Sequence, residues 1–174
     1  MKERWCYRIW QGVAHLGARL RRGGVNTAAA REVLSAESWA LFEGLSAGDQ
    51  AHALRVLAHV RALGNPSPEV EEAALLHDVG KTVAPLGLWW RTLAVLLRAA
   101  GLLGRVPSPD PARPTYPLHV LMHHAEHGAR LCQEAGCSPR VVGLVRWHDT
   151  PPDLLPDHTL LEELKLIRAA DDAS

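Results

Sequence analysis

The sequence from Ala73 to Thr82 reads Ala-Ala-Leu-Leu-His-Asp-Val-Gly-Lys-Thr. An apolar helical run ends here in two side chains that can bind a metal, His77 and Asp78, and we expect Gly80 to end the helix. An imidazole beside a carboxylate is costly to remove from water unless a partner compensates for the lost hydration. The stretch therefore predicts a buried helix end that presents two ligands to a divalent cation.

Further residues that can bind a metal lie on both sides of this pair, each on a segment expected to be helical. In isolation a His-Asp dipeptide is more often a solvated pair at a helix end. This chain adds His52 before the pair and His124, His148 and Asp171 after it. Imidazole and carboxylate ligands without thiolates suit iron, manganese, zinc or cobalt better than copper(I). Four histidines and two aspartates are also more than one ion needs.

The order and surroundings of these residues resemble the HD superfamily of metal-dependent phosphohydrolases. The resemblance extends from about Gly48 to the C-terminus. The segments that carry it are Asp49–Val56 (Asp-Gln-Ala-His-Ala-Leu-Arg-Val), His77–Lys81 (His-Asp-Val-Gly-Lys), His124–Ala129 (His-Ala-Glu-His-Gly-Ala), Val145–His148 (Val-Arg-Trp-His) and Ile167–Asp171 (Ile-Arg-Ala-Ala-Asp). The resemblance implies an all-α fold, a single HD-domain helical bundle of about seven to eight helices with an N-terminal amphipathic helix.

The resemblance also implies a centre of two divalent ions, with Asp78 as the ligand that bridges them. His52, His77 and Asp171 would complete one ion, and His124 and His148 would hold the other. Iron or manganese is the expected metal, with zinc, cobalt and magnesium as alternatives. Two such ions can share a hydroxide that attacks phosphorus and can bind the oxygens of a phosphate. The implied activity is hydrolysis of a nucleotide or another small phosphate ester.

Three residues are expected to take part in the reaction. Asp78 would hold both ions, and Lys81 would contact phosphate oxygens and stabilise the charge that develops on them. A protonated His127 would serve the leaving group, with Asp149 acting through water as the alternative.

Several histidines compete for these assignments. The segment 118–135 carries His119, His123, His124 and His127. By resemblance His124 is the ligand, because Gly128 and Ala129 follow it, but His123 and His127 lie four residues apart and could form a zinc pair. His59 lies seven residues after His52 on nearly the same helix face, and we expect it to be a packing or supporting residue.

Two departures from the family's sequence pattern narrow the range of expected substrates, and two other functions stay open. Asp149-Thr-Pro-Pro-Asp153 follows His148, so the segment lacks the Gly-Tyr-Pro sequence of the cyclic-dinucleotide phosphodiesterase branch. Val-Gly-Lys follows the His-Asp pair in place of the acidic pair associated with alarmone hydrolases. One alternative is a di-iron oxygenase of the HD fold. The other is a non-catalytic protein that senses a metal or nucleotide, or docks on a membrane.

Composition is that of one ordinary globular domain. The chain has 174 residues, of which 47% are hydrophobic and 22% charged, with zero formal net charge. No overall field therefore recruits nucleic acid, and no specific nucleic-acid binding is expected. Three cysteines without a Cys-x-x-Cys pair favour a reduced, cytoplasmic setting, and the N-terminus lacks the features of a cleavable signal.

Two segments could contact a membrane. Residues 1–24 are predicted to form a basic amphipathic helix that precedes the HD domain at 25–174, and it either binds an anionic surface or partner or packs on the domain. Residues 86–103 are apolar and contain Trp89 and Trp90, but arginines within them exclude a membrane span. That segment is either a lid, dimer face or membrane-resting helix, or a plain buried helix.

Helix boundaries follow from capping residues and prolines. We expect helices over 27–45, 46–63 with Ser46 and Asp49 as a capping box, 67–80, 118–135, 138–149 and 159–171 with Thr159 and Glu162 as a capping box. The prolines within 107–117 predict a loop that forms a wall of the substrate pocket. Asp171 lies three residues before Ser174, whereas chains of the family usually continue with further helix. We therefore expect either that Asp171 sits on a fraying turn or that the chain is truncated, and Asp171 is the least secure ligand.

Overall fold

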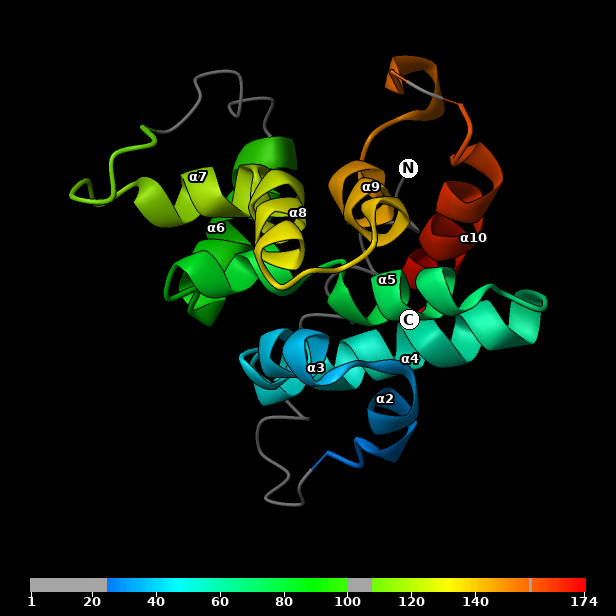
Figure 1. Ribbon diagram of the computed structural model, residues 1–174. Helices are drawn as coiled ribbons and strands as arrows, with labels where there is room; N and C mark the ends of the chain where they lie inside the picture. Colours follow the sequence, from blue (N-terminus) through cyan, green and yellow to red (C-terminus); the bar gives the residue numbers. More distant parts are fainter. Residues whose placement is uncertain (1–24, 100–107, 157) are drawn as a thin grey trace.

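The computed structural model describes residues 25–99, 108–156 and 158–174, and within them it is entirely α-helical (Figure 1). The elements are α2 (Ala28–Val33), α3 (Ala36–Glu43), α4 (Ala47–Leu63), α5 (Pro68–Leu76), α6 (Leu88–Ala99), α7 (Tyr116–Met122), α8 (His124–Glu134), α9 (Pro139–Trp147) and α10 (Leu161–Asp172), with short 3₁₀ helices η1 (Val79–Val83) and η3 (Pro152–Leu154). The described part of the chain confirms an all-α bundle.

Serine caps begin three of the helices where the sequence predicts them. Ser46, Ser67 and Ser138 each accept a hydrogen bond from the backbone N–H three residues later, which satisfies one of the unpaired donors at a helix start. Pro68 and Pro139 follow two of these caps, at positions where the missing N–H costs nothing. The starts of α4, α5 and α9 are therefore decided by local sequence.

Two predicted helices are each divided in two, which is why the described residues hold nine α-helices and not seven to eight. The expected helix 27–45 stops after Val33, and Ser35 caps a new helix by accepting the Ser38 N–H at 3.2 Å. The expected helix 118–135 breaks at His123, whose φ of −117° and ψ of 18° leave the helical range. A local cap in one case and a backbone bend in the other interrupt a continuous apolar pattern.

Three further boundary predictions are wrong. Thr159 is not the N-cap of the last helix, because α10 begins at Leu161 and Leu160 holds the N-cap position. Pro117 belongs to the first turn of α7 and not to a loop, since a helix tolerates proline there. Gly80 does not end α5, which stops at Leu76 and is followed by η1.

The core joins α5 to α4 and α9, and α9 lies between α8 and α10 (Figure 1). Fully buried side chains from these helices meet in one cluster; the largest include Leu57, Leu75, Leu76, Leu144, Leu164 and Ile167. Burial of each such side chain contributes about 1.5 to 3 kcal/mol. This packing brings the C-terminal ends of α5 and α9 against the sides of α4, α8 and α10.

Helix α6 is exposed along one side. Trp89 is 71% exposed and Leu96 is 52% exposed, so a helix buried on all sides is wrong for this segment. The roles of lid, dimer face or membrane-resting helix stay predictions. Among the described residues we find no helix with the length and apolar character that crossing a membrane requires. The predicted N-terminal helix, residues 1–24, lies outside the described residues.

Candidate metal centre

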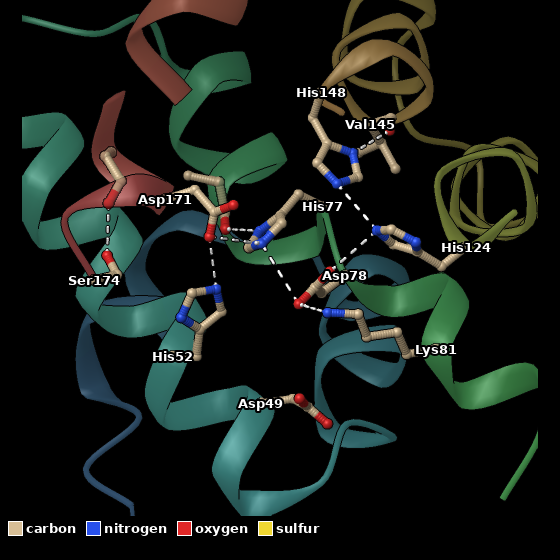
Figure 2. Close-up of polar contacts among 12 residues, drawn as sticks. Asp49, His52, His77, Asp78, Lys81, His124, Val145, His148, Asp171 and Ser174 are labelled. Atoms are coloured by element: carbon tan, nitrogen blue, oxygen red, sulfur yellow. Dashed lines mark hydrogen bonds and ion pairs between the residues drawn. The ribbon is translucent and has the colours of Figure 1, made fainter. Parts of the chain in front are cut away.

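The structure brings all six predicted ligands to one place (Figure 2). Five elements or their ends supply them; His52 comes from α4, His77 and Asp78 from the end of α5, His124 from the start of α8, His148 from the end of α9 and Asp171 from α10. Their assignment as metal ligands stays a prediction. The convergence itself depends on the packing of helices that are far apart in the sequence.

The donor atoms form two groupings that share one residue. His52, His77 and Asp78 make the first, here called the His52 half-site, and Asp78, His124 and His148 make the second, the His124 half-site. Within each grouping the possible ligand atoms all lie within 4.8 Å of one another. Asp78 Oδ2 is 3.6 Å from His77 Nε2, whereas Asp78 Oδ1 is 3.5 Å from His124 Nε2. The two oxygens of one carboxylate thus face different half-sites, as a bridging ligand requires.

Helix ends set the orientation of three imidazoles. Nδ1 of His77, His124 and His148 lies 2.7 to 2.9 Å from the backbone oxygen three residues earlier, that of Ala74, Leu121 and Val145 respectively. Each of these oxygens belongs to the last turn of a helix, where carbonyls lack partners in the helix. A carbonyl only accepts, so Nδ1 carries the proton and Nε2 presents a lone pair to the centre.

This arrangement fits a bound cation and is unfavourable without one. His124 Nε2 and His148 Nε2 face each other at 3.3 Å, although in their neutral forms neither atom carries a proton. His77 Nε2 is buried and has no hydrogen-bond partner among the residues that the structure describes. Buried polar atoms usually have a partner, and an unpaired one costs about 1 to 3 kcal/mol. A divalent ion accepts several such lone pairs at once, so the donors suit the metal that the sequence predicts.

His52 and Asp171 close the other side of the centre. His52 Nε2 lies 2.8 Å from Asp171 Oδ1, and His77 Nε2 lies 3.8 Å from the same oxygen. The Asp171 side chain is 41% exposed, against 2% to 11% for the side chains of His52, His77, Asp78 and His124. Solvent therefore reaches the centre beside Asp171.

Asp171 does not lie on a fraying turn as expected. Helix α10 extends to Asp172, and the hydroxyl of the buried Ser174 donates a hydrogen bond to the Ala170 carbonyl at 2.7 Å (Figure 2). This bond ties down the end of the helix that carries the aspartate.

The electrostatics of the centre favour an ionised carboxylate and neutral imidazoles. Burial alone would raise the pKa of the Asp78 carboxyl, but Lys81 and the imidazoles of His77, His124 and His52 hold that pKa well below its usual range. Burial, with the charges of His77 and His124, lowers the pKa of His148 to about 3. Burial also lowers the pKa of His124. These are the protonation states in which carboxylates and imidazoles bind metals.

The two other predicted catalytic residues differ in their positions. Lys81 Nζ lies 2.5 Å from Asp78 Oδ2, so its charge is at the centre. His127 belongs to neither ligand grouping, and its ring lies 6.0 Å from that of His119, which in turn is 4.4 Å from the ring of His123. Neither does His123 join a grouping of three ligand residues among the described residues, which disfavours the zinc-pair alternative.

Gly80 and Gly128 allow η1 and α8 to touch backbone to backbone. A Cβ atom on Gly80 would lie 1.9 Å from the His124 carbonyl oxygen and 2.5 Å from the Gly128 nitrogen. A Cβ on Gly128 would in turn meet the Gly80 nitrogen at 3.2 Å. This contact brings Asp78 and His124 together across the interface. The glycines of the two motifs therefore allow the close backbone contact that sets the distance between Asp78 and His124. The sequence did not reveal this role.

Arg168 also contacts the centre's framework and was not predicted. Its guanidinium donates to the carbonyl oxygens of His148 at 2.7 Å and Trp147 at 3.1 Å. Nothing in the local sequence distinguishes this arginine, because its partners lie on another helix. Its position three residues before Asp171 is the one available signal.

Comparison with protein families agrees with this geometry. A family model described as HD domain matches residues 50–174, which is more than half of the chain. The chain belongs to the HD domain family. This membership places it in a superfamily of metal-dependent hydrolases, and the His/Asp groupings of this HD domain are compatible with a site for divalent metal. No curated protein and no solved structure matches the chain.

Proposed function

We propose that this HD domain is a phosphohydrolase that uses two divalent ions, iron or manganese, to hydrolyse a nucleotide or another small phosphate ester. The observation that carries the proposal is the pair of half-sites joined by Asp78, whose two carboxylate oxygens face opposite groups of imidazoles. Such a centre, when loaded, lowers the pKa of a water molecule and binds phosphate oxygens.

The protein's own contribution is to present preoriented donors. His52, His77 and Asp171 with Asp78 would hold one ion, and Asp78, His124 and His148 the other. The helix-end carbonyls keep the Nδ1 atoms of His77, His124 and His148 protonated, so that none of these three imidazoles must change tautomer before it binds. In the His52 half-site, His52 Nε2 lies 2.8 Å from Asp171 Oδ1, so a proton occupies this contact and must leave it before both atoms can bind a metal.

Lys81 supports phosphate binding in this proposal. Its ammonium lies against Asp78 and its side chain is 21% exposed, so it borders both the centre and the solvent. A cation there would attract the negatively charged ester and stabilise the charge that grows on the phosphate oxygens during the reaction. Among the described residues His127 belongs to neither ligand grouping, so its leaving-group role is a separate prediction that His127→Gln tests.

The test is phosphate release from a panel of nucleotides and small phosphate esters, after metal is restored to anaerobically purified protein. We expect His77→Ala and Asp78→Ala to lose bound metal and activity together. His59→Ala is the matched control, because His59 belongs to neither ligand grouping. Lys81→Met should retain metal and lose at least about tenfold in kcat/KM, because a hydrogen bond to a charged group contributes about 1.5 to 3 kcal/mol. His127→Gln tests the predicted role of His127 at the leaving group.

Three results would reject the proposal. Full metal content and turnover in the His77 variant would contradict the assignment of the centre. Oxygen uptake by the iron form without phosphate release would identify the di-iron oxygenase instead. Two tightly bound ions with no turnover on any ester would favour the non-catalytic sensor.

A second candidate function, docking on an anionic membrane, has one observation in its favour. Trp89 and Leu96 lie seven residues apart on α6, therefore on one face, and both are more than half exposed. An exposed apolar face with a tryptophan suits a membrane interface. Sedimentation with anionic vesicles, compared between the wild type and Trp89→Ser/Leu96→Ser, tests it; equal sedimentation would exclude this face.

A further inference from the structure

The two half-sites are connected by α10 through more than one residue. Asp171 faces His52 and His77 in the His52 half-site. Arg168, on the same helix and less than one turn earlier, reaches across to the end of α9, where His148 belongs to the His124 half-site. One helix therefore carries a predicted ligand of one half-site and contacts the backbone that carries a ligand of the other.

The contact made by Arg168 suits the site where it occurs. The Nε–H and Nη2–H groups of its guanidinium donate to the carbonyls of His148 and Trp147 at the end of α9. The Trp147 carbonyl also accepts the Thr150 N–H at 3.1 Å, so the fork adds to the backbone bond that ends the helix there. A cation at the C-terminus of a helix is also favoured by the helix dipole. Because two parallel donors fix both distance and direction, the fork restrains the backbone from which the His148 ring extends.

Restraint of the backbone at His148 matters because the His148 side chain makes few polar contacts with other elements. Its Nδ1 binds the Val145 carbonyl within its own helix end, and its Nε2 faces His124. Its neighbours His77 and His124 are imidazoles as well, with ring centroids 5.2 Å away in each case. If the end of α9 frays, the ring keeps its internal bond but loses its place opposite His124.

We propose that Arg168 is a positioning residue that holds His148 for the second ion, so that α10 couples the two half-sites. The inference rests on the two-ion centre of the proposed function but not on the reaction. Loss of Arg168 should selectively weaken the His124 half-site, while His52, His77, Asp78 and Asp171 still bind one ion. A residue with a general structural role would instead lower stability and leave the two affinities in the same ratio.

The same pair of helices offers a matched control. Arg140 on α9 donates to Glu163 on α10 at 2.7 Å, so it also ties α9 to α10. It lies eight residues before His148, about 12 Å along the helix. Arg140→Met therefore removes a tie between these helices without reaching the centre.

The experiment titrates metal-free full-length chain with Mn²⁺ and records ions per chain and both dissociation constants. Wild type and Arg140→Met should bind two ions. Arg168→Met should bind the first ion as wild type does and the second at least about tenfold more weakly, and Arg168→Lys, which keeps the charge but not the fork, should fall between them. Circular dichroism of each metal-free variant checks the fold, and the lysine variant keeps the test decisive if the methionine variant does not fold.

A double-mutant cycle assigns the weakened ion. In a His148→Ala background, Arg168→Lys should have no further effect on metal uptake. In a His52→Ala background, it should weaken the ion that remains. Equal weakening of both ions, an unchanged second ion, or fewer than two ions in the wild type would each overturn the inference. Absence of phosphatase activity in a chain that binds two ions would overturn the proposed function and leave this inference standing.

Discussion

Replacement of Gly80 by alanine is expected to separate the two backbones that bring Asp78 and His124 together. The added Cβ would lie 1.9 Å from the His124 oxygen, whereas real Cβ atoms essentially never approach closer than 3.0 Å. Both obstructing groups, the His124 carbonyl and the Gly128 nitrogen, are backbone atoms, so no side-chain rotation relieves the clash. Helices η1 and α8 must therefore move apart by about 1 Å.

The expected cost can be bounded. A gap of about 0.5 to 1 Å forfeits a quarter to a half of the dispersion energy of the contacts across it, and overpacking of a core typically costs about 1 to 3 kcal/mol. Since backbone must move here, we expect the upper end, about 3 kcal/mol. For a chain of this size that lowers Tm by about 6 to 12 °C. The distance between Asp78 and His124 should grow as well, which weakens metal binding in the His124 half-site.

Two other glycines calibrate the measurement. Gly64→Ala adds a methyl group with nothing within 4 Å, on extended backbone, and should change stability by less than about 0.5 kcal/mol. A Cβ on Gly128 meets Val145 Cγ1 at 3.1 Å and the Gly80 nitrogen at 3.2 Å, and the gain in helix propensity of about 1 kcal/mol offsets part of that strain. Thermal and urea unfolding of the three metal-free variants should rank Gly80→Ala far below the other two. A Gly80 variant as stable as the Gly64 variant would refute the close-contact argument.

Two further predictions concern acid stability and capping. Burial, together with the charges of His77 and His124, lowers the pKa of His148 to about 3, whereas a histidine in the unfolded chain titrates near about 6.5. Between these pH values the unfolded chain therefore binds one more proton than the folded chain. The free energy of unfolding of the metal-free protein should be highest above pH about 6.5 and fall as the pH drops toward 3. Urea midpoints from pH 8 to 4 should show a shallower fall in His148→Gln, and parallel profiles would contradict the assignment. Ser46→Ala removes the cap on the Asp49 N–H and should lower the free energy of unfolding, measured by urea denaturation, by about 1 kcal/mol. Thr27→Ala, at an N-cap position without a side-chain cap bond, should lower it by less.

Sequence predicted best what depends on neighbours along the chain. The caps at Ser46, Ser67 and Ser138 are bonds between residues three apart, and they begin helices where expected. The same local reasoning missed the cap at Ser35 and the bend at His123, where an apolar pattern continues through a break. It also placed the N-cap of the last helix at Thr159, whereas Leu160 holds that position.

The sequence predicted which side chains form the candidate metal centre, because these residues stand in the order typical of the HD domain family. The sequence did not predict the geometry of the centre, because the donors come from helices whose relative positions depend on core packing between distant residues. The resemblance already implied Asp78 as the bridging residue. Only the tertiary structure decided which of its oxygens faces which half-site, that Gly80 lets η1 lie against the backbone of α8, and that Arg168 binds the end of α9. Local propensity determines each helix, whereas the meeting of their ends is a property of the packed core.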